Sequence, residues 1–158
     1  MLGLLRPDAG TVMRAPGLAR TAFQKIYQDP AAAFAPSVTL RRSLLDLIAL
    51  HLLAWDDLAV LMQRLRLPSG LLDRLPSQVS GGELQRFAIA RVLLMRPALI
   101  FADEPTSRLD PLTQQETLLL LHEHAMQHQC AVLLVTHDQD IAARLAQRHI
   151  RLAPHGAR

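Results

Sequence analysis

One stretch, Leu75 to Asp110, constrains the fold of this chain more than any other because it holds three chemically distinct segments in a fixed order. Ser80-Gly81-Gly82-Glu83 indicates the start of a helix. The apolar run Ala98 to Ala102 then ends in Asp103 and Glu104, as expected of a parallel strand that is covered on both faces and reaches the ligand-binding edge of a sheet. The stretch therefore predicts an α/β fold with polar chemistry at its strand ends.

The composition narrows the class of protein. Half of the 158 residues are hydrophobic, which favours one folded domain over disorder. The net charge is +3, but the basic residues are scattered and one Tyr and one Trp offer few stacking surfaces, so we expect no nucleic-acid partner. No apolar run approaches the roughly 20 residues of a membrane span, and no signal segment opens the sequence, so we expect a cytosolic chain. The single Cys130 predicts a buried, reduced thiol.

The segment from Ser80 to Glu83 admits two interpretations. Its S-x-x-E spacing is typical of a capping box, in which the serine and glutamate side chains bond free backbone N–H groups. Taken alone, that structural interpretation is favoured. However, glycines at 81 and 82 cost helix stability, and bare N–H groups at a positive helix end suit a closely approaching phosphate.

Other polar residues also follow apolar runs. Asp110 before Pro111 predicts the cap of a helix from Leu112 to Gln127. His137 follows an apolar strand from Cys130 to Thr136. The histidines at 122, 124 and 128 lack the spacing of a zinc motif, which favours a solvated helix face over a metal site.

The flanking regions supply further elements. We expect a strand from Phe23 to Gln28 that ends at Asp29-Pro30, and helices between Val38 and Leu67. A helix from Ile141 to Ala146 and a final strand from Arg148 to Leu152 close the pattern. The expected buried stripe of the helical region comprises Leu44, Leu47, Ile48, Leu52, Leu53, Leu58, Leu61 and Met62.

Together these motifs resemble the ATPase domain of ABC (ATP-binding cassette) transporters. The run from Ser80 to Arg91 is similar to the signature LSGGQxQRxxIARAL, and the strand ending in Asp103-Glu104 is similar to the Walker B motif. Ser107 to Asp110 resembles the D-loop pattern SALD, with Arg108 where a small residue is usual. Thr136-His137-Asp138 resembles the H-loop, and Tyr27 to Pro36 resembles the Q-loop of peptide and nickel importers.

The resemblance implies a P-loop NTPase-like α/β fold with a parallel sheet core and a small helical subdomain. Residues 1–30 and 96–158 would form the core, and residues 31–95 the helical subdomain with the signature helix. The implied cofactors are ATP and Mg²⁺. Asp103 and Gln28 would serve the metal, and Glu104 and His137 the chemistry at the γ-phosphate. The implied nucleotide-binding residues are Gln28, Ser80, Gly81, Gly82, Glu83 and Asp110.

The motif G-x-x-x-x-G-K-[ST], which cradles phosphates in this family, does not occur in the sequence. Lys25 is the only lysine, and Gln24 and Ile26 flank it. We therefore expect an N-terminally truncated domain whose phosphate loop would lie just before Met1. We also expect the missing strand to pair beside the strand at 98–103 and to leave its flank bare.

The functional prediction is an ATP-binding subunit that couples ATP hydrolysis to import of a peptide or nickel, peripheral on the cytoplasmic face of the membrane. Its implied partners are permease subunits and a second ATPase subunit. One alternative is a non-hydrolysing partner that lends its signature motif to a subunit carrying a phosphate loop. Another is a gene fragment or a misplaced start. The sequence does not identify the solute.

Overall fold

Three parallel strands form the sheet in the computed structural model, which describes residues 8–13 and 16–151. The order is β1 (Phe23–Ile26), β2 (Leu99–Asp103), β3 (Ala131–Val135). Phe23 pairs with Leu99, and Leu99 in turn with Ala131. Parallel neighbours need long crossover connections, and helices supply both of them. The predicted parallel α/β core is therefore confirmed.

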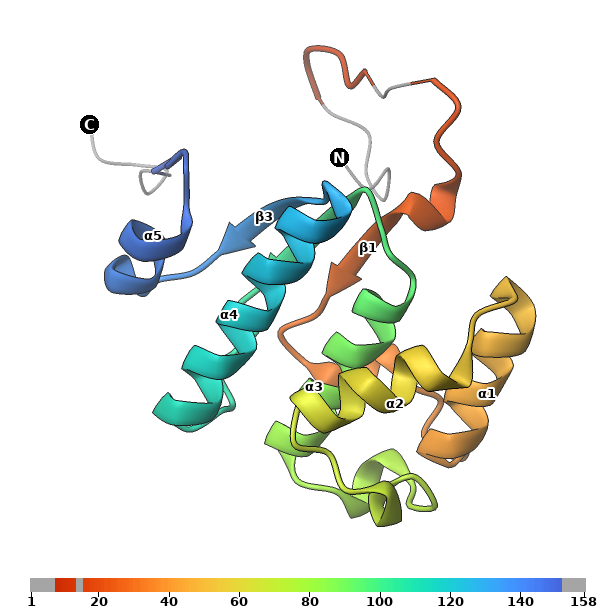
Figure 1. Ribbon diagram of the computed structural model, residues 1–158. Coiled ribbons are helices and arrows are strands. Elements are labelled where there is room, and N and C mark those ends of the chain that lie inside the picture. Colours follow the sequence, from red (N-terminus) through yellow and green to blue (C-terminus); the bar gives the residue numbers. More distant parts are fainter. Residues whose placement is uncertain (1–7, 14–15, 152–158) are drawn as a thin grey trace.

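The helices fall into two groups along the chain (Figure 1). Those between β1 and β2 lie to one side of the sheet, with α1 and α2 gathered around α3, whereas α5 lies beyond β3 at the opposite end. The first group is η2 (Pro30–Ala33), α1 (Leu40–His51), α2 (Trp55–Arg64), η3 (Ser69–Leu71), η4 (Pro76–Gln78) and α3 (Gly81–Leu94), and the second is α4 (Pro111–His128) and α5 (Gln139–Leu145). One short helix, η1 (Arg20–Ala22), comes before β1.

Helix α3 is the centre of the core. Most of its residues from Leu84 onward are buried, and Phe87 and Ile89 are fully so. It packs against α2, η2 and β1, and its side chains join one apolar cluster with Ile26 of β1 and Ile100 of β2. A helix that is apolar on nearly all sides must lie inside the molecule. The signature helix therefore connects the sheet to the helical region.

The helical region follows its predicted pattern except at one residue. Thr39 caps α1 by accepting a bond from the Arg42 amide at 3.3 Å, and Leu44 and Leu58 are fully buried. Leu52, predicted to be buried, is 93% exposed. It is the residue at which α1 ends in a left-handed conformation, with φ of 54°, so its side chain leaves the apolar stripe.

The strand order corrects one prediction. β2 pairs with β1 on one side and with β3 on the other, so neither of its flanks is bare. Within the described sheet, the open edges belong to β1 and β3. Although β3 is a continuous apolar run, Val132 is 38% and Val135 41% exposed. The exposed apolar strand is thus β3, because the described structure gives it a neighbour on one side only.

Two other predictions are wrong. The strand expected at 148–152 does not form at residues 148–151, and Leu152 lies outside the described residues. His124, assigned to a solvated face, is 6% exposed. Burial, then the charges of His128 and Arg96, lower the pKa of His124 to about 4. The imidazole is therefore a neutral core group, 4.4 Å from the His128 ring.

Two features are absent from the part of the chain that the structure describes. No group of three or more His, Cys, Asp or Glu side chains there is placed to hold a metal ion. None of the helices in residues 8–13 and 16–151 is both long and apolar enough to cross a membrane.

Candidate functional site

The N-terminus of α3 is closed by a reciprocal capping box. The Ser80 amide donates to Glu83 Oε2 at 2.7 Å, and the Glu83 amide donates to Ser80 Oγ at 3.2 Å. The backbone N–H of Ser80 is the main cause that lowers the pKa of the Glu83 carboxyl, and the Ser80 side chain adds to it. The capping box expected from the S-x-x-E spacing is therefore present. Glu83 positions Ser80 and the start of the helix.

The two glycines have different surroundings, which sequence reasoning did not foresee. A Cβ atom on Gly82 would lie 3.1 Å from the Arg108 carbonyl oxygen and 3.4 Å from Leu109 Cδ2. A Cβ atom on Gly81 would meet only the Arg108 side chain, at 3.5 Å. Contact with a backbone oxygen is hard to relieve. Close packing within the chain therefore favours glycine at position 82, independently of any ligand.

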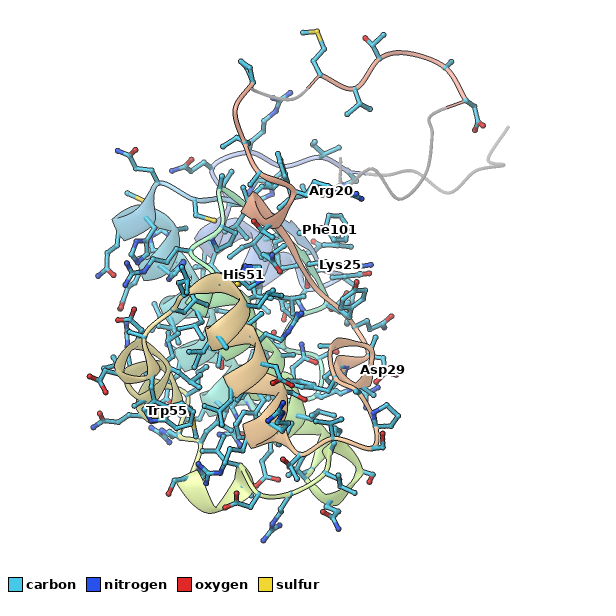
Figure 2. All side chains as sticks on the ribbon, turned by 90° about the vertical axis from the view of Figure 1, so that its right-hand side faces the viewer. Arg20, Lys25, Asp29, His51, Trp55 and Phe101 are labelled. Carbon is cyan, nitrogen blue, oxygen red and sulfur yellow. The ribbon has the colours of Figure 1, made fainter. Side chains whose placement is uncertain are left out.

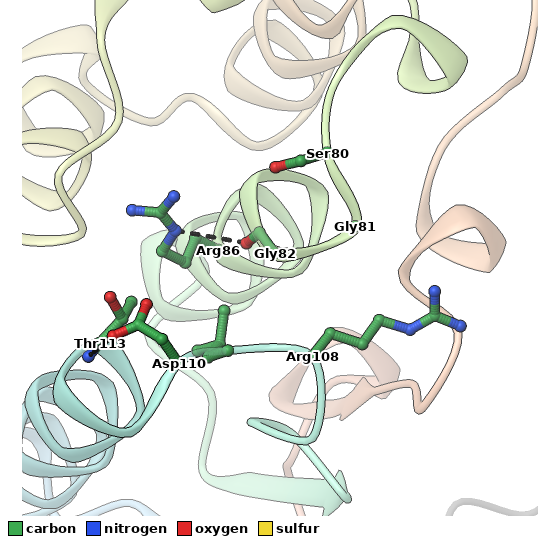
Figure 3. Close-up of a pocket in the computed structure, with 8 residues that line it drawn as sticks. Ser80, Gly81, Gly82, Arg86, Arg108, Asp110 and Thr113 are labelled. Carbon is green, nitrogen blue, oxygen red and sulfur yellow. Dashed lines mark hydrogen bonds between the residues drawn. The ribbon is translucent and has the colours of Figure 1, made fainter.

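A cavity of about 460 Å³ lies between the start of α3 and the turn before α4 (Figure 3). Arginines stand on two of its walls, and Asp110 lies near Thr113 at the side of α4. The lining residues are Ser80, Gly81, Gly82, Arg86, Arg108, Leu109, Asp110 and Thr113. A helix N-terminus and two guanidinium groups favour an anion in this cavity, whereas the Asp110 carboxylate on its wall opposes one.

The two arginines of the cavity are held in different ways. Arg86 donates to Gly82 O at 3.3 Å and to Leu65 O at 3.0 Å, so its guanidinium is tied to the backbone. Arg108 instead forms an ion pair of 3.5 Å with Asp29, in the loop that contains Gln28. The turn after β2 and the loop after β1 therefore meet at the start of the signature helix.

Asp110 caps α4 as the sequence predicted. Its carboxylate accepts a bond from the Thr113 amide at 3.1 Å. The side chain and amide of Thr113 lower the pKa of the Asp110 carboxyl. Asp110 therefore shapes one wall of the cavity by fixing the direction of α4.

Glu104 and His137 meet at the carboxyl ends of adjacent strands. Glu104 Oε1 accepts a bond from the His137 amide at 2.9 Å and lies 2.6 Å from His137 Nδ1. This carboxylate is the main cause that raises the pKa of His137. The Glu104 side chain is 19% exposed and that of His137 86%. Two residues 33 positions apart are thus brought into one site.

The backbone at Glu104 is unusual. Its φ is 46°, in the left-handed region that a residue with a side chain rarely adopts, and its amide donates to the Val135 carbonyl at 3.0 Å. That bond extends the β2–β3 ladder by one residue. The strained turn directs the Glu104 carboxylate toward His137 instead of continuing the strand.

Asp103 ends β2 and is the residue expected to serve Mg²⁺. Its carboxylate offers the hard oxygen ligands that this ion prefers. However, Lys25 Nζ lies 3.7 Å from Asp103 Oδ2, so the carboxylate already has a cation beside it. Gln28, the other expected ligand, is exposed in the loop after β1. Asp103 and Gln28 therefore fit a Mg²⁺ ion that is held mainly by water and phosphate. Lys25 would compete with this ion for the Asp103 carboxylate.

Gln85 was not identified from the sequence. It is 1% exposed, and its Nε2 donates to the Tyr27 carbonyl at 3.4 Å, next to Gln28. Its Oε1 has no partner among the described residues. The only signal in the sequence was a polar amide among the apolar residues of α3. Gln85 thus ties the signature helix to the loop that carries Gln28.

The predicted residues therefore fall into two groups. Ser80, Gly81, Gly82 and Asp110 line the cavity, with Glu83 at its edge in the capping box. Asp103, Glu104 and His137 lie at the ends of β2 and β3 and are not among the cavity's lining residues. The first group surrounds a helix start, beside which Arg86 and Arg108 add positive charge, whereas the second presents carboxylates and a histidine.

Comparisons with known proteins identify the family of this chain. Residues 1–107 match the family model described as ABC transporter. The nickel import system ATP-binding protein NikE of Staphylococcus aureus (strain bovine RF122 / ET3-1) is 34% identical over 158 residues, which cover 96% of this chain and 66% of NikE. The macrolide export ATP-binding/permease protein MacB of Rhodopirellula baltica is 44% identical over 97 residues, covering 61% of this chain and 14% of MacB.

Solved structures show the same fold. A dimeric ATP-binding cassette in a post-hydrolysis state with ADP and Pi is 29% identical, with a TM-score of 0.65, over 76% of this chain and 54% of that one. An ATP-binding subunit of an ABC transporter is 27% identical, with a TM-score of 0.69, over 80% and 52%. The chain spans about half the length of these structures and 66% of NikE.

Proposed function

Because this chain belongs to the ABC transporter ATP-binding family, we propose that it serves as the ATP-binding subunit of an importer and couples ATP binding and hydrolysis to solute uptake. The observation that carries the proposal is the meeting of Glu104 and His137 at the ends of β2 and β3. A carboxylate beside the γ-phosphate that can accept a proton from water is the central requirement of this chemistry.

We infer a role for each atom of this pair from its contacts. Both contacts from His137 use Glu104 Oε1, and no described residue donates to Oε2. Oε2 is therefore the oxygen that can accept the proton of an attacking water. His137 is held with its ring exposed, and in its protonated form, which Glu104 favours, Nδ1 donates to Glu104 while Nε2 can donate to a phosphate oxygen. When bound, ATP supplies the γ-phosphoryl group that is transferred to water.

The residues that line the cavity would act on a nucleotide held by a second subunit. Ser80, Gly81 and Gly82 present the N-terminus of α3, and Arg86 and Arg108 add positive charge beside it. Backbone N–H groups at a helix start bind phosphate well. Such an arrangement needs a partner ATPase subunit, with permease subunits to carry the solute and to hold the chain at the cytoplasmic face of the membrane.

The NikE relative supports nickel as the solute, because the likeness extends over 96% of this chain. The peptide alternative rests only on the resemblance of Tyr27 to Pro36 to the Q-loop of peptide and nickel importers. The likeness to MacB covers 97 residues and supports only the general family role. Uptake of nickel and of short peptides by cells with and without the chain distinguishes these solutes.

The direct test is the Mg²⁺-ATPase activity of the membrane complex purified through a tag on this chain. Glu104→Gln removes the proton acceptor with almost no change in shape, and we expect activity to fall by about 100-fold or more. Glu123→Gln is the matched control, because Glu123 pairs with Arg64 on the surface, away from the strand ends. Equal activity of Glu104→Gln and the unmodified complex would refute the assigned role.

A second candidate function rests on a specific observation. The sequence contains no G-x-x-x-x-G-K-[ST] motif, whereas the cavity at Ser80 is built entirely from residues of this chain. The chain can therefore act as a non-hydrolysing partner that donates its signature motif. Alone, it should show negligible ATPase activity, because no loop positions the phosphates.

Rescue experiments separate the two functions. This chain is added to a phosphate-loop-bearing partner whose own signature motif is disabled, and ATPase activity is measured. If the chain acts only as a donor, Glu104→Gln rescues as well as the unmodified chain, whereas Ser80→Arg does not, because it places a bulky cation at the helix start. Loss of rescue with Glu104→Gln favours the catalytic function. No rescue by any folded version excludes the donor function.

A further inference from the structure

Lys25 is the only lysine of the chain, and it lies beside the carboxylate expected to serve a metal ion. It is on β1 directly opposite Phe101 of β2, and both side chains extend to the same side of the sheet (Figure 2). Lys25 Nζ is 3.7 Å from Asp103 Oδ2, two residues further along β2. The parallel register of β1 and β2 therefore creates this pair.

Two aromatic rings hold the lysine in place. Lys25 Nζ lies 4.9 Å from the centre of the Tyr27 ring and 5.3 Å from that of Phe101. Both distances are within the range of cation–π attraction. The side chain is 24% exposed, less than any other basic side chain in the described ion pairs. The two rings thus fix the position of the ammonium group beside Asp103.

The same geometry allows another cation to displace the Lys25 ammonium group from Asp103. A separation of 3.7 Å is longer than a normal hydrogen bond, and Asp103 is 33% exposed, so water weakens the attraction. A divalent cation that reaches Asp103 must compete with the ammonium and is repelled by it while it remains close. The pair should therefore weaken metal binding without preventing it.

We propose that Lys25 is a resident counter-ion of Asp103 and determines how readily a divalent cation occupies that carboxylate. This inference rests on the proposed function only in taking Asp103 as the metal-binding carboxylate. Lys25 would leave its place at Asp103 when the cation binds there.

The first test uses Mn²⁺ alone and the full chain labelled with ¹⁵N. Bound Mn²⁺ broadens the NMR signals of nearby amides, so weak binding at the end of β2 is measurable. Lys25→Gln should lower the Mn²⁺ concentration that half-broadens the Asp103 and Glu104 amides by about fivefold to tenfold. Arg20→Gln removes one positive charge near β1 without touching this pair, and should stay within about twofold of the unmodified chain.

The second test needs no change at Lys25. Because the chain has one lysine, selective lysine labelling gives one set of side-chain signals, shifted by the rings of Tyr27 and Phe101. Mg²⁺ should move these signals toward the position of a free lysine. In Asp103→Asn they should already lie nearer that position and should not respond to Mg²⁺.

Three results overturn the proposal. The first is equal Mn²⁺ midpoints for Lys25→Gln and the unmodified chain. The second is unchanged broadening in the double variant Lys25→Gln with Asp103→Asn, because the ion would then bind elsewhere. The third is a lysine signal that does not respond to Mg²⁺ at any concentration. None of these results bears on the Glu104→Gln test of ATPase activity, so failure of this inference is distinguishable from failure of the proposed function.

Discussion

Replacing Gly82 with alanine tests whether packing within the chain requires the second glycine of the signature motif. In a helix, glycine to alanine gains up to about 1 kcal/mol from propensity alone. At position 82 the new methyl group would lie 3.1 Å from the Arg108 carbonyl oxygen. Overpacking of this kind costs about 1–3 kcal/mol. We therefore expect Gly82→Ala to destabilise the chain by about 1 kcal/mol.

The turn that contains Arg108 cannot easily move away. The Leu109 amide donates to Thr106 O at 3.1 Å, and the Ser107 amide donates to Glu104 O at 3.2 Å. Asp110 then fixes the start of α4. These bonds hold the carbonyl against position 82, so relief of the contact would have to break part of the turn.

Gly81→Ala is the matched control, because it adds the same methyl group one residue earlier. There the nearest atoms belong to the flexible Arg108 side chain at 3.5 Å, so we expect a gain of about 0.5 kcal/mol. The two variants should then differ in melting temperature by about 3–6 °C for a chain of this size. Thermal unfolding followed by circular dichroism measures this difference.

The double variant Gly82→Ala with Arg108→Ala identifies the atom responsible. Removing the Arg108 side chain leaves its carbonyl oxygen in place, so the penalty at position 82 should persist. If Gly82→Ala proves at least as stable as Gly81→Ala, the packing argument is refuted, and the ligand-based explanation of Gly82 stands alone.

Three further predictions concern the cap of α3 and the exposed strand β3. Ser80→Ala should cost about 1 kcal/mol in urea unfolding through the lost cap, whereas Ser107→Ala, outside any helix start, should cost less. Folding lowers the pKa of Glu83, so this carboxylate stabilises the fold at pH values above its usual pKa near 4.5. That stabilisation disappears as the pH falls through the lowered pKa. Glu83→Gln should therefore flatten the decline of the unfolding free energy in that acidic range, measured by urea unfolding at a series of pH values. Val132→Lys on the exposed strand β3 should reduce aggregation in light scattering, whereas Arg42→Lys on α1 should not.

Local chemistry made part of this fold predictable. The caps at Ser80 and Asp110 depend on residues within three positions, and both form as expected. β2 and its acidic end were predictable because a short apolar run followed by two carboxylates already defines a strand and its edge. The burial of Cys130 likewise follows from its position in an apolar run.

Contacts between distant segments were not predictable in the same way. The neighbours of β2 depend on the arrangement of the whole sheet, so the bare flank was assigned to the wrong strand. The Lys25–Asp103 pair and the contact of Gly82 with Arg108 arise only after β1, α3 and the turn before α4 are assembled. Leu52 fits a helical stripe by spacing, but the helix ends there and changes the direction of its side chain.

The strand order also sets an order for folding. Phe23 pairs with Leu99 at a separation of 76 residues (99 minus 23), whereas Leu99 pairs with Ala131 at 32 (131 minus 99). Closing the longer loop costs about 0.8 kcal/mol more, so β2, α4 and β3 should assemble before β1 joins them. During synthesis β1 nevertheless leaves the ribosome first. At about 5–20 residues per second, Ile26 waits roughly 4–15 s for Ala102, its partner on β2, to be made. Among the three described strands, β1, which carries Lys25, is thus synthesised first and is expected to be the last to join the sheet.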